Sequence, residues 1–437
     1  MLVFFESVFE EKFYLSRAAT KSVFLDGSLF QNGIEASGLM CQGNFHLRRN
    51  VDVKGESFFL GATVEGNFDC SSASFEVLDT TQRALNCERM IIQNNVFLNK
   101  QFTAKGEVRF LGARINGDFF CSNGSFESLD EDQHALVCDG MTITGGLFLR
   151  RNCQILRGSL DLTRASVGSL VYDAYFWKQK DLKTVYMDGF KYGYIHGDIS
   201  ASFYLENMLG KMPRDEFAPQ PYKQLAKVLR TMGHKSDADE VMIALHEKKM
   251  EISKHESLSY LFQKIYKWTS LYGYRPLRLV YIMLSIWIFF GFIYWYAASV
   301  AVFAPSNPLI FQKGYNCTID QKGTPWDALP KDYNASNNWY YATPPEYSTF
   351  QPFWYSLDLL LPTLDLQLEK DWGVVIPSPK GNWTDGSAFL TTNDNNEIVF
   401  IINYQIRFFV WIEILIGWIL GIGLVAFVSG QLRIVED

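Results

Sequence analysis

The sequence predicts a β-solenoid (parallel β-helix) domain, a helical-hairpin connector, and a two-span α-helical membrane domain with a re-entrant pore-type helix. Three observations predict this fold class: a tandem repeat in the N-terminal half, a change to helical spacing after Pro213, and two long apolar segments near the C-terminus. The net charge of −7 over 437 residues argues against a nucleic-acid-binding surface, which needs a concentration of basic residues.

The N-terminal domain repeats itself. GESFFLGATVEGNFDCSSASFEVLD (55–79) aligns with GEVRFLGARINGDFFCSNGSFESLD (106–130) at an offset of 51 residues, from Gly55 to Gly106. The short apolar pieces separated by Gly, Asn and Ser have the length of strands and lack a helical face. Tandem units of this kind are typical of solenoids, in which each coil buries its apolar side chains against the next. We therefore expect an N-terminal cap over 1–22 and a β-helix over 23–205.

Six of the seven cysteines fall in this domain. Cys70 and Cys121 recur at the repeat spacing, as do Cys87 and Cys138, so we expect them to stack inward as small hydrophobic thiols. CxxC and mixed Cys/His spacings are missing from the sequence, which predicts no metal site and no cofactor.

The spacing of apolar residues changes between the repeats and the first apolar segment. Leu225 and Leu229 share one helical face, and Gly233 follows as a stop signal. This pattern predicts a helical hairpin connector over 206–256. The next stretch, 257–278, is amphipathic, aromatic and basic, which is typical of a helix lying at a membrane surface.

Two segments are long and apolar enough to span a bilayer, 279–304 and 398–431, and Glu413 lies within the second. Four basic residues and no acidic residue lie between Glu256 and the first span, and such flanks stay inside. The apolar start of the chain is interrupted by early glutamates, unlike a secretory signal. We expect a two-pass protein of the inner (plasma) membrane, with the N-terminus and the tail 432–437 in the cytoplasm.

Acidic extracytoplasmic loops are expected over 305–347 and 373–397. Between them, within 348–372, lies FWYSLDLLLPTLDL (353–366). An apolar helix of about ten residues before Pro362 is too short to span a bilayer. Backbone that leaves a helix at membrane depth is tolerated where protein or water surrounds it, so the segment predicts a re-entrant pore helix and loop.

The candidate residues for an ion pathway are Asp358, Thr363, Asp365 and Glu413. Intramembrane acids are costly and mark functional sites by default, and rings of carboxylates favour cations. Two alternatives stay open: Asp358 bonds nearby backbone groups or Tyr or Trp hydrogens, and Glu413 pairs with a neighbouring Lys or Arg or with a second subunit's backbone. In the second span, Gly417, Gly421 and Gly423 predict either close helix packing or a hinge.

The order of span, external loop, FWYSLD helix, PTLDLQ loop and glycine-bearing span resembles the two-helix pore module of the potassium-channel-like superfamily. In that family the short helix leads into a TVGYGD filter, and the matching place here reads PTLDLQ. The resemblance implies an oligomeric pore around the short helix.

A second resemblance covers more of the chain. GEVRFLGARINGDFFC, PQPYKQLAKVLRTMGH and YSLDLLLP together resemble a bacterial family of uncharacterised membrane proteins, grouped near pentapeptide-repeat proteins and often labelled membrane-associated oxidoreductase. This chain contains no GxGxxG opening a helix after a strand and no CxxC, and we expect that it is not an enzyme.

The function expected is an oligomeric membrane pore or ion channel, cation-preferring, coupled to a cytosolic β-helix that acts as a sensor or scaffold. A two-span subunit has too few helices to enclose water, so we expect a homo-oligomer, with a tetramer favoured. The expected partners are the lipid membrane, further copies of the chain, and a cytosolic ligand or protein on the β-helix. The alternative is a membrane-anchored β-helix scaffold or partner-binding protein that conducts nothing.

Overall fold

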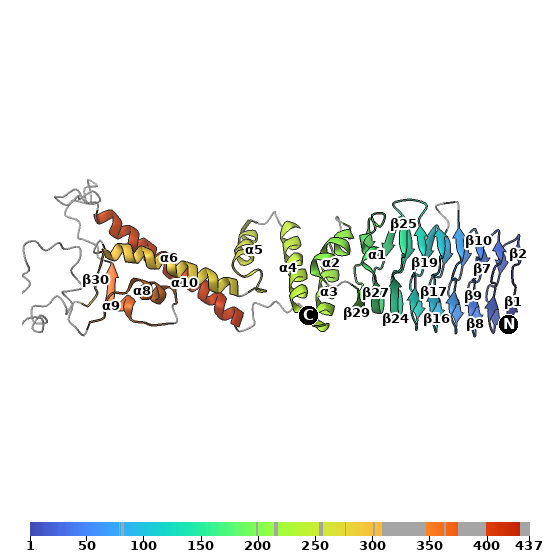
Figure 1. Cartoon of the computed structure of the whole chain (residues 1–437), viewed down its shortest axis with the longest axis horizontal. Helices are drawn as coiled ribbons and strands as arrows, with labels where there is room; N and C mark the ends of the chain where they lie inside the picture. The colour runs from blue at the N-terminus through green and yellow to red at the C-terminus, as the bar shows by residue number, and fades with distance from the viewer. Residues whose placement is uncertain are drawn as a thin grey trace, which may run out of the picture. The chain divides into compact units, whose positions relative to one another are not determined.

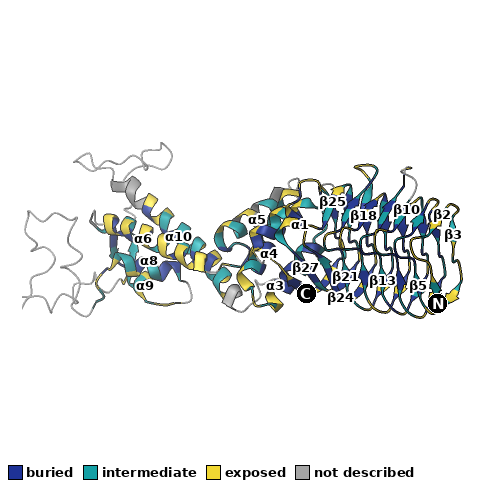
Figure 2. Ribbon diagram, turned by 45° about the vertical axis from the view of Figure 1, so that its right-hand side comes forward, coloured by how far each residue is buried: buried dark blue, intermediate teal, exposed yellow. Residues whose placement is uncertain are grey.

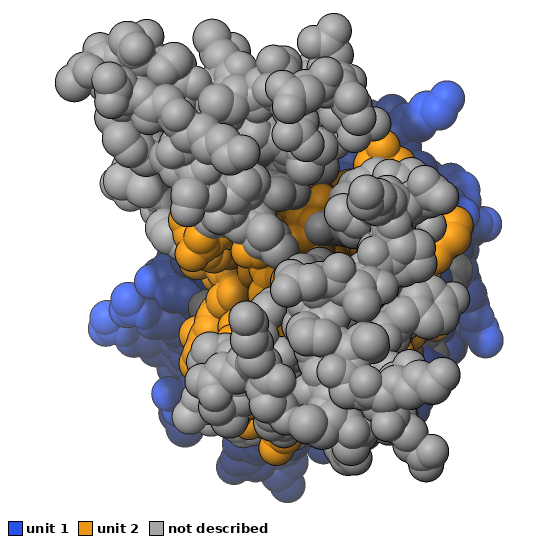
Figure 3. Space-filling view, turned by 90° about the vertical axis from the view of Figure 1, so that its left-hand side faces the viewer, with its two compact units in different colours: residues 1–252 blue, residues 253–437 orange. Residues whose placement is uncertain are grey.

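The computed structural model describes all residues except 78, 80–82, 198–199, 214–216, 253–256, 276, 300–301, 308–346, 362–363, 375–398 and 429–437. The chain divides into two compact units, Met1–Ile252 and Ser253–Asp437 (Figure 3), and each is described by itself. Most of the expected loops 305–347 and 373–397, and the whole of the expected tail, lie outside the described residues.

The first unit contains a parallel β-solenoid of about eight turns, which confirms the predicted solenoid (Figure 1). In a regular coil four short strands follow one another, and each pairs in parallel with the equivalent strand of the next coil; Phe45 pairs with Phe68, for example.

The strands form three sheets. The first contains β1 (Leu2–Val3), β5 (Val23–Phe24), β9 (Phe45–His46), β13 (Phe68–Asp69), β17 (Val96–Phe97), β21 (Phe119–Phe120), β24 (Thr142–Leu149), β20 (Arg114–Ile115), β16 (Ile91–Ile92), β12 (Thr63–Val64), β8 (Met40–Cys41) and β4 (Ala19–Thr20), with β27 (Ser166–Tyr172) and β29 (Lys191–His196) attached. The second contains β2 (Val8–Phe9), β6 (Leu29–Phe30), β10 (Asp52–Lys54), β14 (Ser74–Glu76), β18 (Thr103–Lys105), β22 (Ser125–Glu127) and β25 (Gln154–Arg157). The third contains β3 (Phe13–Tyr14), β7 (Ile34–Glu35), β11 (Ser57–Phe58), β15 (Arg83–Asn86), β19 (Glu107–Arg109), β23 (His134–Val137), β26 (Ser159–Asp161) and β28 (Val185–Tyr186).

The 51-residue repeat corresponds to two coils of unequal length. Phe68 pairs with Val96, 28 residues later, and Val96 pairs with Phe119, 23 residues later. The expected cap at 1–22 is itself the first coil, because β1 to β4 lie there and pair with the second coil.

The interior of the solenoid is a column of apolar side chains in which the cysteines take part. Cys70, Cys87, Cys121 and Cys138 are free thiols and fully buried, as the repeat predicted. Burial disfavours a thiolate and raises the pKa of each of these thiols well above its usual value. They serve as small hydrophobic side chains.

A ladder of Asn and Asp side chains ties successive coils together. The Oδ1 atom of Asn44 accepts from the Asn67 N–H at 2.8 Å, and Oδ1 of Asn67 accepts from the Asn95 N–H at 3.1 Å. Oδ1 of Asn95 accepts from the Asp118 N–H at 2.8 Å, and Oδ1 of Asp118 accepts from the Gly146 N–H at 2.7 Å. Each contact satisfies a backbone donor at a corner where the strand ladder is interrupted.

Helices cover the C-terminal end of the solenoid: α1 (Ala174–Lys178), α2 (Ala201–Asn207), the 3₁₀ turn η1 (Leu209–Lys211), α3 (Gln220–Thr231) and α4 (Lys235–Ile252) (Figure 1). The Gln224 side chain on α3 donates to the Tyr192 carbonyl on β29 at 2.7 Å, and Gln220 donates to the Phe190 carbonyl. The helical hairpin expected as a connector is therefore part of the first unit and closes this end.

The second unit contains α5 (Ser257–Ser270), α6 (Leu277–Ser299), β30 (Phe303–Pro305), α8 (Pro352–Leu360), α9 (Leu368–Asp371), β31 (Trp372–Val374) and α10 (Val399–Val428). Two helices are long and apolar enough to cross a membrane, over Leu277–Ala298 and Gln405–Val425. Many of their large apolar side chains are exposed (Figure 2), including Phe289 on α6 and Leu415 on α10.

Candidate functional site

The candidate site is built around α8, the short helix Pro352–Leu360. Pro352 stands in the first turn, where its fixed φ suits a helix and its missing N–H costs nothing. The helix has only nine residues, and its buried residues include Tyr355, Ser356 and Asp358. Because α8 packs against both α6 and α10, its polar groups need partners within the unit.

Glu413 on α10 supplies the central polar contact. Its side chain is fully buried, and its two carboxylate oxygens accept hydrogen bonds from different helices. The Ser356 hydroxyl on α8 donates across 2.5 Å, and the Tyr294 hydroxyl on α6 donates across 2.6 Å. One carboxylate therefore connects α6, α8 and α10, and its partners are hydroxyl groups of the same chain.

The contact between α6 and α8 depends on a tryptophan and a glycine. The Trp287 indole N–H donates to the Phe353 carbonyl at 2.6 Å. The Phe353 ring lies directly over Gly291, where an added Cβ would come within 2.3 Å of the ring. A side chain at this position on α6 would displace the ring and with it the first turn of α8.

The contact between α10 and α8 depends on Gly417. A Cβ at Gly417 would lie 2.4 Å from the Leu360 carbonyl oxygen, which is backbone and has no room to move. At Gly423 the nearest atom to such a Cβ is a methyl of Leu279, 3.9 Å away. Gly421, the second glycine of the GxxxG pair, is half-buried. Close packing, one of the two roles considered for these glycines, therefore applies to Gly417.

Asp358 shapes the chain that follows α8. Its carboxylate accepts from the Leu366 N–H at 2.7 Å and from the Glu369 N–H at 2.9 Å, and the side chain is 6% exposed. These two bonds fold the returning segment back over the helix and place α9 beside its C-terminal end. The backbone-bonding alternative considered for Asp358 is thus the arrangement found.

Asp365 lies at the surface of this returning segment. It forms an ion pair with Lys370 and accepts from the Gln367 N–H at 3.0 Å. The hydrogen bond from Lys370 holds the pKa of the Asp365 carboxyl below its usual value. Glu369, beside Lys370, is also exposed.

An aromatic cluster holds the other end of α8. Phe303 on β30 stacks on Phe350 with ring centroids 4.4 Å apart, and Tyr355 meets both rings edge-on or tilted. Trp372 on β31 completes the cluster, and β31 pairs antiparallel with β30. The strand β30, which precedes α8 in the sequence, and the strand β31, which follows it, therefore pair with each other next to α8.

The structure places Asp358 on α8, where it bonds the segment that follows, and Glu413 on α10 in contact with α8, and it leaves Asp365 exposed. Thr363, the fourth candidate, lies outside the described residues. The sequence analysis missed Ser356 and Tyr294. The signal was available, because an acid inside an apolar span needs donors and these hydroxyls stand in apolar stretches. Among the described residues no group of three or more His, Cys, Asp or Glu side chains is arranged to hold a metal ion.

We compared the chain with protein-family models, curated proteins and solved structures. No protein-family model, no curated protein and no solved structure matches the chain. The resemblances to the potassium-channel-like pore module and to the bacterial β-helix family therefore stay predictions, and function has to be argued from the site itself.

Proposed function

We propose that the second unit is one subunit of an oligomeric, cation-preferring pore in the inner (plasma) membrane, with the first unit on the cytoplasmic side. The observation that supports this most directly is the contact of Ser356 with Glu413. It holds a helix too short to span a bilayer against the middle of a helix that is long enough. An anchor made of two spans has no need of a third helix at that depth.

The segment after α8 supports the same proposal. Backbone that turns at membrane depth must be surrounded by protein or line a water-filled cavity. Asp358 bonds this segment from inside, and the segment presents the carboxylates of Asp365 and Glu369 on its exposed side. Copies arranged around an axis would form a ring of carboxylates, which favours cations.

Enclosing water requires several copies of a two-span subunit, and we propose a homo-oligomer with a tetramer favoured. The basic residues just before α6 and in its first turn, Arg275 and Arg278, support a cytoplasmic first unit. The solenoid then offers its outer faces to a cytosolic ligand or protein, whose binding would act on the pore.

One observation favours the second candidate, a membrane-anchored scaffold without conduction. Lys370 pairs with Asp365 and offsets the charge that a cation pathway would use. In the scaffold reading, α8 only stiffens the pair of spans, and the solenoid carries the function by binding a partner.

The deciding experiment is the current through the purified full chain in liposomes, with the reversal potential read in asymmetric KCl. Asp365→Asn should lower cation preference because it removes charge from the exposed ring, whereas Lys370→Gln should raise it because it frees the Asp365 carboxylate. Glu65→Gln, an exposed solenoid carboxylate, is the matched control and should change nothing. Absence of current, or equal reversal potentials in all four proteins, would favour the scaffold.

A further inference from the structure

The two ends of the solenoid differ. Helices close the C-terminal end, whereas β1, β2, β3 and β4 are the terminal strands of their sheets (Figure 1). An edge strand presents backbone N–H and C=O groups that form a template for another strand. Terminal coils of solenoids are therefore normally covered.

The direction of the free groups follows from the bonds already made. Leu2 and Phe4 donate to the second coil, at Ser22 and Phe24, so the peptide groups of Val3 between them face the open end. The same alternation applies on the other three sides. Phe13 and Leu15 donate to the second coil and leave Tyr14 facing outward.

Val8 and Ala19 occupy the equivalent positions on β2 and β4. The carbonyls of Ser7 and Phe9 accept from the second coil on either side of Val8, and those of Ala18 and Thr20 do so on either side of Ala19. Val8 is 59% exposed, which is unusual for a valine in a strand.

The core is also uncovered at this end. The Phe4 ring, 37% exposed, packs edge-on to Phe9 at 5.4 Å and to Phe13 at 6.1 Å between ring centroids. These rings end the apolar column, so covering them would remove apolar surface from water.

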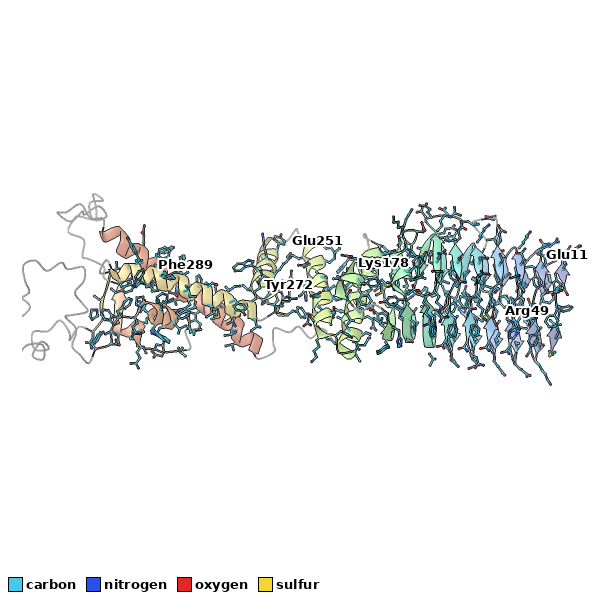
Figure 4. The ribbon with its side chains drawn as sticks, viewed as in Figure 1. Glu11, Arg49, Lys178, Glu251, Tyr272 and Phe289 are labelled. Atoms are coloured by element: carbon cyan, nitrogen blue, oxygen red, sulfur yellow. The ribbon has the colours of Figure 1, made fainter. Side chains whose placement is uncertain are left out.

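The charges around the first coil are divided between its two halves. Going round the coil, the first two corners carry exposed Glu6 and then Glu10 and Glu11 (Figure 4 labels Glu11). The next two corners carry exposed Arg17 and Lys21. Lys12 does not offset the glutamates at the open end, because its ammonium lies over the Phe58 ring of the third coil.

We propose that this open end binds the same end of a second copy of the chain. A two-fold axis lying in the plane of the end, and passing through β1 and β3, places Glu6 opposite Lys21 and the Glu10–Glu11 corner opposite Arg17. Each contact occurs twice, as a two-fold interface requires. The division of charge thus selects this one among the in-plane orientations.

The same axis makes the facing strands antiparallel, because it reverses the direction in which the partner's coil runs. Val3 then meets Val3 of the second copy, and Tyr14 meets Tyr14. Val8 of each copy meets Ala19 of the other. Directly opposed residues of an antiparallel pair exchange both N–H···O bonds, so all four outward-facing peptide groups are satisfied.

This proposal is independent of the pore, because it uses only residues of the first coil. It is tested by oxidative cross-linking of the full chain in detergent. Val3→Cys should form a disulfide dimer by itself, because hydrogen-bonded antiparallel partners have Cα atoms about 5.5 Å apart, within disulfide reach. Val8→Cys and Ala19→Cys should each cross-link poorly alone and readily when the two proteins are mixed.

Two controls accompany these variants. The unchanged chain reports any reaction of the native thiols, and Met40→Cys places an exposed thiol on the wall of the second coil. Neither should cross-link. Failure of both Val3→Cys and the mixed pair would overturn the proposal, as would efficient cross-linking of Val8→Cys alone, which would require a different axis.

A charge exchange provides a second measurement. In the Val3→Cys background, Glu10→Arg with Glu11→Arg should lower the cross-linked fraction about tenfold, since like charges then face each other. Adding Arg17→Glu to the same chain should restore it. Loss without restoration, in a protein whose circular dichroism is unchanged, would contradict the orientation proposed.

Discussion

Ser356 on α8 and Glu413 on α10 lie 57 residues apart in the sequence, and the serine hydroxyl donates to the carboxylate across 2.5 Å. Tyr294 on α6 donates to the other carboxylate oxygen. One acceptor group therefore bonds side chains from two other helices.

We predict that Glu413→Ala destabilises the second unit more than Glu413→Gln. Alanine leaves the buried Tyr294 hydroxyl without its acceptor, at about 1–3 kcal/mol, and leaves the Ser356 hydroxyl only the Trp287 carbonyl at 3.2 Å, whereas glutamine keeps one acceptor oxygen. Ser356→Ala should also lower the melting temperature in detergent. Ser285→Ala is the matched control, because that hydroxyl donates to the Tyr281 carbonyl of its own helix. Equal melting temperatures for the two serine variants would contradict the three-helix contact.

Gly417→Ala should be poorly tolerated and Gly423→Ala well tolerated, although both add one methyl group to the same helix. The first methyl would lie 2.4 Å from the Leu360 carbonyl oxygen, and the second would lie 3.9 Å from a flexible leucine. Detergent-extracted yield and melting temperature measure the difference. A hinge role would instead make both variants fold normally and differ only in current.

Asp358→Asn should lower stability, whereas Asp365→Asn should leave it unchanged. Asp358 makes two charge-assisted bonds from a buried position, and such bonds contribute about 1.5–3 kcal/mol each. Asp365 is exposed, and its pairing with Lys370 is screened by water. Melting of the two purified variants in one detergent compares them directly, and an equal loss in both would show that α8 does not depend on Asp358.

The thiols of Cys70, Cys87, Cys121 and Cys138 should react slowly with a maleimide at pH 8 in the folded protein. Burial keeps the maleimide away from these thiols. It also raises their pKa, so little of the reactive thiolate forms. Denaturation should make all of them reactive. The exposed thiol of Met40→Cys should react quickly under native conditions, and native cysteines that match its rate would contradict the buried column.

His46 should make the solenoid less stable in mild acid. Burial, and then the charge of Arg48, lowers the pKa of His46, although Asp69 and Asp26 act in the opposite sense. The unfolded chain therefore binds a proton that the folded chain does not, and stability is lost as the pH falls through about 6.5.

His46→Phe should remove this loss of stability in acid, because phenylalanine does not bind a proton. Its ring would pack against Phe24, which the His46 ring already meets edge-on with 4.8 Å between ring centroids. The test is the fall in melting temperature of the first unit between pH 7.5 and pH 5.5, which should shrink in the variant. An equal fall in both proteins would assign the pH dependence to other groups.

The repeat alone was enough to predict the solenoid, because stacked coils need the same residue types at the same positions. The repeat did not give the length of a single coil. Two successive coils, of 28 and 23 residues, together make the 51-residue period, so aligning the repeats reveals the two-coil unit and not the individual coils. The segment expected as a cap, 1–22, lacks the repeat's glycines, and its strands nevertheless pair regularly with the second coil.

Local patterns singled out Glu413 but did not identify its partners. Pairing with a neighbouring Lys or Arg, or with a second subunit's backbone, was the alternative to a role in an ion pathway, and the partners found are Ser356 and Tyr294, far away in the sequence. Spacing could not distinguish Gly417 from Gly423, because the difference lies in the Leu360 carbonyl on another helix. Contacts of this kind depend on tertiary structure and produce no periodic pattern in the sequence.

The unequal pair of coils has a genetic consequence. An in-frame duplication of 51 residues inserts two complete coils, adds about 10 Å of solenoid, and returns every strand to the face it left. The ladder of Asn and Asp side chains and the column of thiols would continue through the insertion with their spacing intact. Lineages of such a protein can therefore differ by whole coils, and an insertion that does not complete a coil would have to leave the wall as a loop.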